Sequence, residues 1–281
     1  MTLTRREAAA RLQAHGLAPS RALGQNFVVD PNTVRRIARL AEVGPDDRVV
    51  EIGAGLGSLT LALADTGAAV TAIEVDRGLV PLLRAEVEPR GVRVVEADAM
   101  RLDWAELLGE EPGSWVLVAN LPYNVATPLV ADVLDDVPQV GRMLVMVQRE
   151  VAERLAARPG DEAYGAVSVK VAYWATAEVV GRVPASVFLP RPNVESALVA
   201  IRRRAEPAVG PEVSRERLFA LVRAGFGQRR KMLRRSLAGL VTAEQFAAAG
   251  VRPEARAEEL GVEDWGRLAA AAAAAASAGE R

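Results

Sequence analysis

Short runs of apolar, β-branched residues alternate with stretches of helical period over residues 48–157. The runs are nearly continuous in hydrophobicity, which is typical of strands that helices cover on both faces. They are RVVEIG (48–53), AVTAIEV (69–75), VRVVEAD (92–98), WVLVAN (115–120) and MLVMVQ (143–148). The helix candidates between and after them are 57–66, 77–88, 104–109, 127–136 and 148–157. This alternation predicts an α/β fold with a parallel, doubly wound sheet.

The pattern changes after this region. Two further runs, 176–183 and 195–203, predict an antiparallel pair of strands at the edge of the sheet. The segment AEPAVGPEV (205–213) has no apolar period and predicts a linker. Helical character then continues without strands, over 214–224, 230–240, 243–249 and 263–277, ending in an alanine-rich tail. We therefore expect a large α/β domain over 1–205 and a small all-helical domain over 206–281.

Composition narrows the class of protein. Half of the 281 residues are hydrophobic and the net charge is -1, which fits an ordinary globular protein. Residues 201–281 nevertheless carry 15 basic against 10 acidic residues, whereas 1–200 carry 20 against 26. The C-terminal part is thus the expected contact for a polyanion.

Several kinds of chemistry are excluded by residue type. The chain has no cysteine and one histidine, His15, so disulfides, thiol nucleophiles and imidazole clusters are absent. No acidic cluster has the spacing of a metal site, and no metal is expected. No run approaches the roughly 18 apolar residues of a membrane helix, so we expect a cytoplasmic protein without membrane contact.

Candidate chemistry lies at the carboxyl ends of the strands, where open α/β sheets bind ligands. The first strand ends in Gly53-x-Gly55-x-Gly57, a turn that brings bare backbone close to a ligand at the start of a helix. This signal is weak alone, because a NAD-binding loop, another nucleotide loop or a tight structural turn has the same pattern.

The next strand ends add polar side chains suited to an adenosine. Glu74 follows Gly57 by seventeen residues and can accept hydrogen bonds from ribose hydroxyls, although a solvated glutamate is the alternative. Asp98 can accept from an exocyclic amine such as that of adenine, or it can cap a helix. Asn120 ends the fourth strand. Four such ends in succession predict an adenosine-containing ligand.

The segment Asn120-Leu121-Pro122-Tyr123 is not expected of a NAD site. Proline restricts Leu121 to extended geometry, so nearby carbonyls can face a ligand instead of joining a helix. An amide oxygen and a backbone carbonyl can together accept both hydrogens of an NH2 group, while Tyr123 stacks on the ring. Two such acceptors stabilise the positive charge that develops when the amine attacks an activated methyl group. A Pro-Tyr turn that packs on the core is the alternative.

These residues, taken with other motifs, resemble the KsgA-type (RsmA) bacterial family of small-subunit ribosomal RNA adenine N6-dimethyltransferases. The resemblance covers nearly the whole chain. The motifs that carry it are LGQNFVVD (23–30), VVEIGAGLGSLT (49–60), IEVD (73–76), EADAM (96–100), NLPYNVATPL (120–129), VQREVAERLAARPGDEAYG (147–165), VFLPRPNVESAL (187–198) and FGQRRKMLRRSL (226–237). It implies a Rossmann-like class I methyltransferase domain over 1–205, with an N-terminal arm (1–30), and a helical domain over 206–281 that contacts RNA or the ribosome.

The resemblance also implies roles for individual residues. Those expected at S-adenosylmethionine are Gln25, Asn26, Val28, Gly53, Ala54, Gly55, Glu74, Val75, Asp98, Ala99 and Asn120. Those expected at the target base are Asn120, Leu121 and Pro122 as acceptors for N6, with Tyr123 on one face and Phe188 on the other. Those expected at RNA phosphates are Arg229, Arg230, Lys231, Arg234 and Arg235, although such a run can also be a solvated helix face.

The implied substrate is a pair of adjacent adenosines in the 3′-terminal hairpin loop of small-subunit (16S) ribosomal RNA, within an immature subunit, acted on by a monomer. Ala166 and Gly227 depart from the pattern, where arginine and asparagine are usual. The missing charge at Ala166 is expected either to weaken RNA positioning or to alter the order of the methyl transfers, and to leave the cofactor site intact; Arg191 is a candidate compensating charge. The alternatives are a resistance methyltransferase that acts on large-subunit RNA, and an assembly checkpoint factor whose catalysis is secondary.

Overall fold

The computed structural model describes residues 3–278, which fold into two compact units. Unit 1 comprises the described residues up to Ala152 together with Ala177–Arg203, and unit 2 comprises Glu153–Thr176 and the described residues from Arg204 onward. The segment 153–176, which precedes the linker expected at 205–213, therefore packs with the C-terminal helices. The chain crosses between the units three times.

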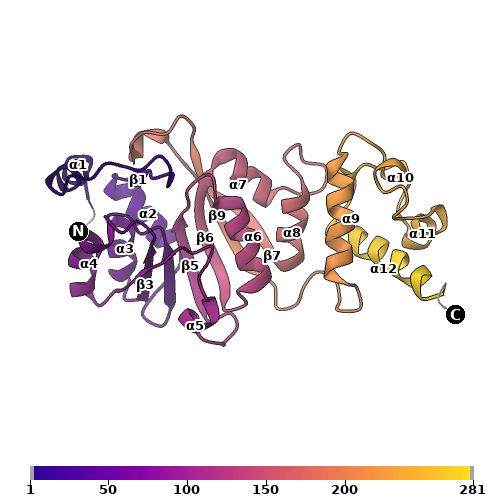
Figure 1. Ribbon diagram of the computed structural model, residues 1–281, viewed down its shortest axis with the longest axis horizontal. Coiled ribbons are helices and arrows are strands. Elements are labelled where there is room, and N and C mark those ends of the chain that lie inside the picture. Colours follow the sequence, from indigo (N-terminus) through magenta and orange to yellow (C-terminus); the bar gives the residue numbers. More distant parts are fainter. Residues whose placement is uncertain (1–2, 279–281) are drawn as a thin grey trace. The chain divides into compact units, whose positions relative to one another are not determined.

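Unit 1 is built on a seven-stranded sheet with the order β4-β3-β2-β5-β6-β9-β7. Its strands are β2 (Arg48–Ile52), β3 (Ala69–Glu74), β4 (Arg93–Glu96), β5 (Trp115–Asn120), β6 (Val140–Gln148), β7 (Ala175–Val183) and β9 (Ser196–Arg203). The pairings from β4 to β6 are parallel and β9 is antiparallel to β6. All five predicted core strands are confirmed, and the two predicted edge strands are neighbours in the sheet (Figure 1).

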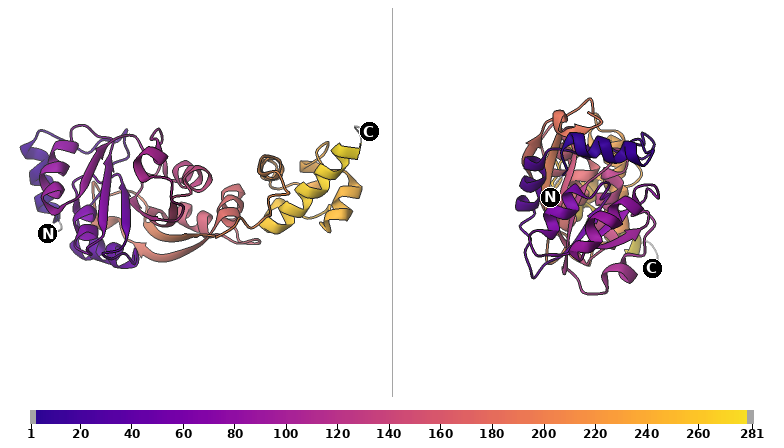
Figure 2. Two further views of the ribbon diagram at one scale, coloured as in Figure 1. Left: turned by 90° about the horizontal axis from the view of Figure 1, so that it is seen from below. Right: turned by 90° about the vertical axis from the view of Figure 1, so that its left-hand side faces the viewer.

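Helices of unit 1 flank these strands (Figures 1 and 2). They are α1 (Arg5–Ala14), α2 (Pro31–Leu40), α3 (Ser58–Ala64), α4 (Val80–Val87), α5 (Trp104–Leu108), α6 (Ala126–Asp136) and the start of α7 (Arg149–Ala156), with short 3-10 turns η1 (Glu88–Arg90) and η2 (Ala185–Val187). Buried side chains of α2, α3 and α4 form one apolar cluster with those of the strands. The runs of β2, β3, β5 and β6 are nearly continuous in hydrophobicity because most of their residues are buried, whereas β4 at the edge is more exposed.

The N-terminal arm is tied to a segment far along the chain. Its strand β1 (Phe27–Val28) pairs antiparallel with β8 (Phe188–Leu189), outside the main sheet. The Arg5 guanidinium donates to the carbonyl oxygens of Ser186 and Phe188, each at 2.7 Å. Asp30 caps α2 by accepting from the Thr33 backbone N–H at 2.8 Å, which fixes where the arm ends.

Unit 2 is helical and has its own core. It contains the end of α7, α8 (Ala166–Trp174), α9 (Arg215–Gly227), α10 (Leu233–Ser236), α11 (Ala243–Ala249), η3 (Ala257–Glu259) and α12 (Val262–Ala278). Its apolar cluster includes Tyr164, Phe219 and the fully buried Trp265. Within residues 3–278, no helix is long and apolar enough to cross a membrane.

The helix predicted over 230–240 is wrong, since only α10 forms there. The backbone of this segment bonds to residues 253–256 instead: the Leu233 N–H donates to the Ala255 carbonyl at 2.8 Å and the Arg234 N–H to that of Pro253 at 2.9 Å. Gly239 then adopts φ 79°, a left-handed conformation that ends the helical turn. A basic run that reads as a helix face is therefore largely irregular backbone.

Candidate active site

The turn after β2 forms the floor of the site. Gly53 and Gly55 adopt φ of 73° and 57°, which a residue with a Cβ reaches only with strain. A Cβ on Gly55 would also lie 2.9 Å from the Phe27 ring of the arm. The turn is anchored to β3, because the Gly53 N–H donates to the Ile73 carbonyl at 2.9 Å. Bare backbone at this point therefore lets the arm lie close above it.

The carboxylate of Glu74 sits at the end of β3 and organises the floor. It accepts from the backbone N–H groups of Gly55 (2.7 Å), Val75 (3.0 Å) and Asp76 (2.9 Å). Burial raises the pKa of Glu74, and these hydrogen bonds oppose that rise. A carboxylate has about four acceptor positions, so three bonds leave capacity for a ligand hydroxyl. The solvated alternative is excluded, since Glu74 is 5% exposed.

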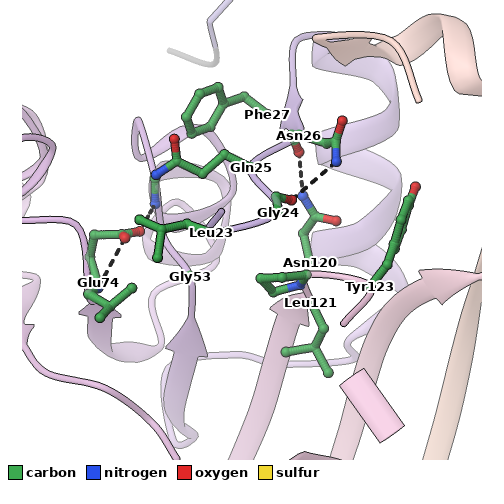
Figure 3. Close-up of a pocket in the computed structure, with 13 residues that line it drawn as sticks. Leu23, Gly24, Gln25, Asn26, Phe27, Gly53, Glu74, Asn120, Leu121 and Tyr123 are labelled. Atoms are coloured by element: carbon green, nitrogen blue, oxygen red, sulfur yellow. Dashed lines mark hydrogen bonds between the residues drawn. The ribbon is translucent and has the colours of Figure 1, made fainter. Parts of the chain in front are cut away.

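The arm residues Leu23–Phe27 cross the strand ends and close one side of the site (Figure 3). The Gln25 amide nitrogen donates to a carboxylate oxygen of Asp76 at 2.7 Å. At Gly24, φ is 62° and an added Cβ would meet Pro122 at 3.1 Å, so glycine permits this close approach. The arm, the turn and Glu74 line an open cavity of ≈ 510 Å³.

Asn120 is oriented by the arm. Its amide nitrogen donates to the backbone carbonyl of Asn26 at 2.8 Å, so the amide oxygen is the end left to accept a hydrogen bond. In Figure 3 that oxygen points to the side on which Tyr123 stands. The Leu121 N–H donates to the Met146 carbonyl at 3.0 Å, whereas no described donor bonds to the Leu121 carbonyl. Both the Asn120 amide oxygen and the Leu121 carbonyl oxygen are therefore without a described donor.

Pro122 contributes differently from the expectation. Its carbonyl accepts from the N–H groups of Val125 and Ala126, both at 3.1 Å, in the turn that starts α6. The carbonyl oxygen is therefore engaged within the protein. Pro122 instead restricts the preceding residue, Leu121, to extended geometry, so that the Leu121 carbonyl does not join the helix.

Of the two aromatic residues expected at the base, Tyr123 lies in the cavity and Phe188 lies in the apolar core. Tyr123 lines the cavity, and its hydroxyl forms a 2.9 Å hydrogen bond with the Ser196 hydroxyl on β9. Burial raises the pKa of Tyr123, which keeps the phenol neutral. Phe188 is fully buried in the apolar core beside Val28 and presents no exposed ring face. Its stacking on a base stays a prediction that requires the ring to leave this cluster.

A second cavity of ≈ 710 Å³ lies at the ends of β2, β3 and β4. It is lined by apolar side chains, including Val75, Ala99 and Met100, together with Asp98. Asp98 accepts from the Met100 N–H at 3.0 Å, and so caps a turn. The helix-cap alternative is wrong, because the next helix, α5, is capped by Asp103. An apolar slot with one carboxylate suits a flat heterocycle with an amine.

Some residues at the site were not identified from the sequence. Leu23 and Phe27 line the first cavity and Met100 lines the second. The sequence could have identified them by position, since they are adjacent to the polar residues of the motifs LGQNF and EADAM. Apolar lining residues carry no distinctive pattern of their own, so only this adjacency could have identified them. No cluster of three or more acidic or histidine side chains suited to a metal occurs among the described residues.

The comparisons with known proteins agree with this geometry. The family model described as "Ribosomal RNA adenine dimethylase" matches residues 18–274. The chain belongs to the ribosomal RNA adenine dimethylase family. The resemblance drawn from the sequence motifs is confirmed, and this dimethylase family has an α/β class I methyltransferase fold like that of unit 1.

Relatives in the dimethylase family match over nearly their full length. The chain is 52% identical over 265 residues to "Ribosomal RNA small subunit methyltransferase A" of Thermobifida fusca, covering 90% of both chains. It is 49% identical to the protein of the same name from Streptomyces coelicolor, covering 94% of this chain and 93% of that one.

Two solved structures extend the comparison. The 23S rRNA methyltransferase ErmE is 30% identical with a TM-score of 0.67, covering 88% of this chain and 100% of its own. A dimethyladenosine transferase from Plasmodium falciparum has a TM-score of 0.68, covering 85% of this chain and 94% of its own, and at 23% identity shows the fold alone.

Proposed function

We propose that the protein transfers methyl groups from S-adenosylmethionine to N6 of two adjacent adenosines in the 3′-terminal hairpin loop of 16S ribosomal RNA. The products would be N6,N6-dimethyladenosines, formed in the cytoplasm by a monomer acting on an immature small subunit. Family membership supports the reaction, and the relatives named small subunit methyltransferase A support the choice of RNA.

The residues at the strand ends fit S-adenosylmethionine. The bare backbone at Gly53 leaves room for a methionine moiety, the buried Glu74 suits ribose hydroxyls, and the apolar slot with Asp98 suits an adenine. When bound, S-adenosylmethionine supplies a methyl group made electrophilic by its sulfonium centre. The chain's own residues then bind and orient the amine that receives it.

The observation that carries the proposal is the pair of acceptors at Asn120. The amine of adenine is a poor nucleophile because its lone pair is delocalised into the ring. The Asn120 amide oxygen and the Leu121 carbonyl can each accept one of its hydrogens, which favours a pyramidal nitrogen and stabilises its developing positive charge. Because the Asn26 carbonyl holds the amide nitrogen, the oxygen is already aimed before the substrate arrives.

An Asn120→Ala variant tests this. Removing one group that stabilises developing charge typically costs about 10²–10³-fold in rate, and we expect such a loss of methyl transfer to 16S RNA, read by mass spectrometry of the nucleosides. S-adenosylhomocysteine affinity is measured in parallel, so that a displaced arm is not mistaken for lost catalysis. Asn32→Ala, at an exposed asparagine of α2 that bonds Arg35, is the matched control. Dimethylation by Asn120→Ala at the wild-type rate would refute the proposal.

A large-subunit substrate is the second candidate, favoured by the similarity to ErmE over most of this chain. The higher identity to the small-subunit relatives favours 16S RNA. Methyl transfer to 23S RNA and to immature small subunits, measured side by side, separates the two. A checkpoint role predicts instead that the Asn120→Ala variant supports normal maturation of small subunits without methylation.

A further inference from the structure

Four arginine side chains of unit 1 take no part in the reaction described above. Two lie on residues 179–194, which run from β7 through η2 and β8 to the loop before β9 and contain no acidic residue. The other two reach this segment from the helices α1 and α2. The four are Arg182 and Arg191 on the segment, Arg5 of α1 and Arg36 of α2. They gather in a part of the chain, residues 1–200, whose overall balance is acidic.

Arg5 and Arg36 are held in place by neutral partners. The Arg5 guanidinium donates to two carbonyl oxygens of the segment, and Arg36 Nη1 donates to the Arg182 carbonyl at 3.0 Å. An added Cβ on Gly181 would clash with the Arg36 guanidinium, so glycine at this position makes room for it. A carbonyl carries no net charge, and a guanidinium has five N–H donors. Both groups therefore keep their full charge and further donors for a ligand, in an orientation fixed before any ligand arrives.

The four side chains lack the acidic partners that arginines have elsewhere in unit 1. Arg11 pairs with Glu86 and Arg142 with Asp47, each at 2.6 Å. None of the four forms an ion pair with another residue of the described range 3–278. Arg5 is moreover the first residue of α1, where the helix dipole disfavours a positive charge. Because like charges repel one another, their grouping without counter-charges indicates an anion that binds from outside the protein.

The acidic residues closest to this segment in the sequence and in α1 do not neutralise it. Glu195, which follows the segment, pairs with Arg149 at 3.5 Å, and Glu7 of α1 accepts from the Thr4 backbone N–H at 2.8 Å. Glu178, which precedes the segment in β7, is exposed and forms no ion pair with a described residue. The surface formed by the four arginines therefore keeps an excess of positive charge.

This surface borders the place where the target base is proposed to bind. Phe188 of β8 pairs in register with Val28 of β1, and the preceding residue, Phe27, lines the cavity that contains Asn120. Beside the segment lies an open hollow of ≈ 780 Å³, lined by residues 184–186 and 191–195. A nucleic-acid strand that enters the base site thus has room to continue beside Arg191.

We propose that the four arginines bind phosphates of the RNA strand that carries the target adenosines. The inference rests on the proposed function, which identifies the anion as RNA. A guanidinium group binds two phosphate oxygens at once through parallel N–H donors, and it stays charged at any physiological pH. Phosphate contacts set the position and orientation of a nucleic acid and carry no sequence information. The arginines of unit 1 thus hold the strand while Asn120 acts on the base.

The double variant Arg182→Gln/Arg191→Gln tests this, because neither side chain bonds to a described residue and the fold does not depend on them. Its matched control is Arg90→Gln/Arg93→Gln, which removes two exposed arginines at or near β4, at the opposite edge of the sheet from β7. The probe is the 3′-terminal hairpin of 16S RNA with its stem. Its affinity for the full chain is measured by fluorescence anisotropy at several salt concentrations, and calorimetry with S-adenosylhomocysteine checks the cofactor site.

The variant Arg182→Gln/Arg191→Gln should lower the slope of log affinity against log salt by about 1.4–1.8, since each phosphate contact contributes about 0.7–0.9. It should raise KM for the RNA more than it lowers kcat, because these side chains bind the strand without touching the base. The control should keep the wild-type slope, and both variants should bind S-adenosylhomocysteine as the wild type does. A wild-type slope in Arg182→Gln/Arg191→Gln, with methyl transfer intact, would overturn the inference and leave the proposed function standing. Failure of the wild type to bind this RNA would refute both.

Discussion

The amide of Asn120 is oriented by a backbone carbonyl. Its nitrogen donates to the carbonyl oxygen of Asn26, so any side chain at position 26 that keeps the arm in place would preserve this bond. The Asn26 side chain has a separate partner, because its amide donates to the Gly24 carbonyl at 3.1 Å. Asn26 thus shapes the arm, whereas Asn120 is the residue that we propose acts on the substrate.

The stability of the free protein should depend on the protonation of Glu51. Burial raises its pKa to about 8 in the folded state, above the ordinary value of a glutamate, so the folded state binds the proton more tightly than the unfolded state. Stability from this group is fully present below the ordinary pKa and is lost as pH rises toward 8, at up to about 1.4 kcal/mol per pH unit. Thermal unfolding of Glu51→Gln should therefore show a flatter pH dependence than the wild type between pH 5 and pH 8. Parallel curves for the two proteins would contradict this.

Residues that line the candidate site were predictable where a polar side chain follows an apolar strand. Glu74 and Asn120 end β3 and β5, and the sheet brings these ends together. Glu51 has the same charge but is preceded by Val50 and followed by Ile52 inside a strand, so its buried oxygen without a hydrogen-bond partner shows only once the packing is known. Phe188 stands in a motif, yet its burial depends on pairing with the arm, which no local pattern specifies.

The glycine turn and the arm should behave as one element. Gly55→Ala places a Cβ against the Phe27 ring, whereas Gly91→Ala has open space at a similarly left-handed backbone position, φ 80°. Both changes should cost about 1–2 kcal/mol of stability through backbone strain. Only Gly55→Ala should also weaken S-adenosylhomocysteine binding, by about tenfold or more, as measured by calorimetry. Equal affinities of the two variants would show that the arm does not depend on this contact.

Arg203 stabilises the end of α6 by donating hydrogen bonds to backbone carbonyl groups there. The guanidinium donates to the carbonyl oxygens of Val133, Leu134, Val137 and Val140, at 2.9–3.1 Å. Arg203→Met keeps an apolar stem but leaves these carbonyls without their donor, so we expect a loss of about 2–4 kcal/mol in denaturant unfolding. Arg202→Met is the neighbouring control: it removes only an exposed ion pair with Glu42 and should cost less than about 1 kcal/mol. Similar losses in both variants would contradict the assignment.

Helices were predictable where one face is polar, and less so elsewhere. The segment GAVSVKVAYW (165–174) is rich in valine and was not predicted as a helix, although it forms α8. Its Val169 and Tyr173 are buried in the core of unit 2, so packing overrides the strand preference of β-branched residues. The opposite error occurred at 230–240, where long-range backbone bonds replace helical ones.

The basic side chains of the run 229–235 fall into two groups, those that form an ion pair within unit 2 and those that do not. Arg229 and Arg234 pair with Glu258 and Glu254, at 2.7 Å and 3.5 Å, within unit 2. The side chains of Arg230, Lys231 and Arg235 are exposed and form no ion pair with another described residue. These three are therefore the ones available to RNA phosphates.

Changing those three residues to glutamine should weaken RNA binding in a salt-dependent way. Each phosphate contact contributes about 0.7–0.9 to the slope of log affinity against log salt, so the slope should fall by up to about 2–3. The double variant Arg229→Gln/Arg234→Gln should change the slope less, because its charges are already neutralised. Fluorescence anisotropy with a 16S fragment between low and moderate salt measures this. An unchanged slope in the triple variant would exclude these contacts.

Because the chain is synthesised from its N-terminus, the position of β8 in the sequence determines when the arm can be fully anchored at the site. The strand β1 needs β8 as its partner, and Arg5 needs the carbonyls of Ser186 and Phe188, so these contacts of the arm form only after that segment is synthesised. By then the first part of unit 2, Glu153–Thr176, is already made. The contacts of Gln25 with Asp76 and of Asn26 with Asn120 need only earlier parts of the chain. A nascent chain that stops short of position 186 would thus carry the glycine turn, Asn120 and the arm, but lack the strand β8 that pairs with the arm. We therefore expect the arm to be fully anchored only after about two thirds of the chain has been translated.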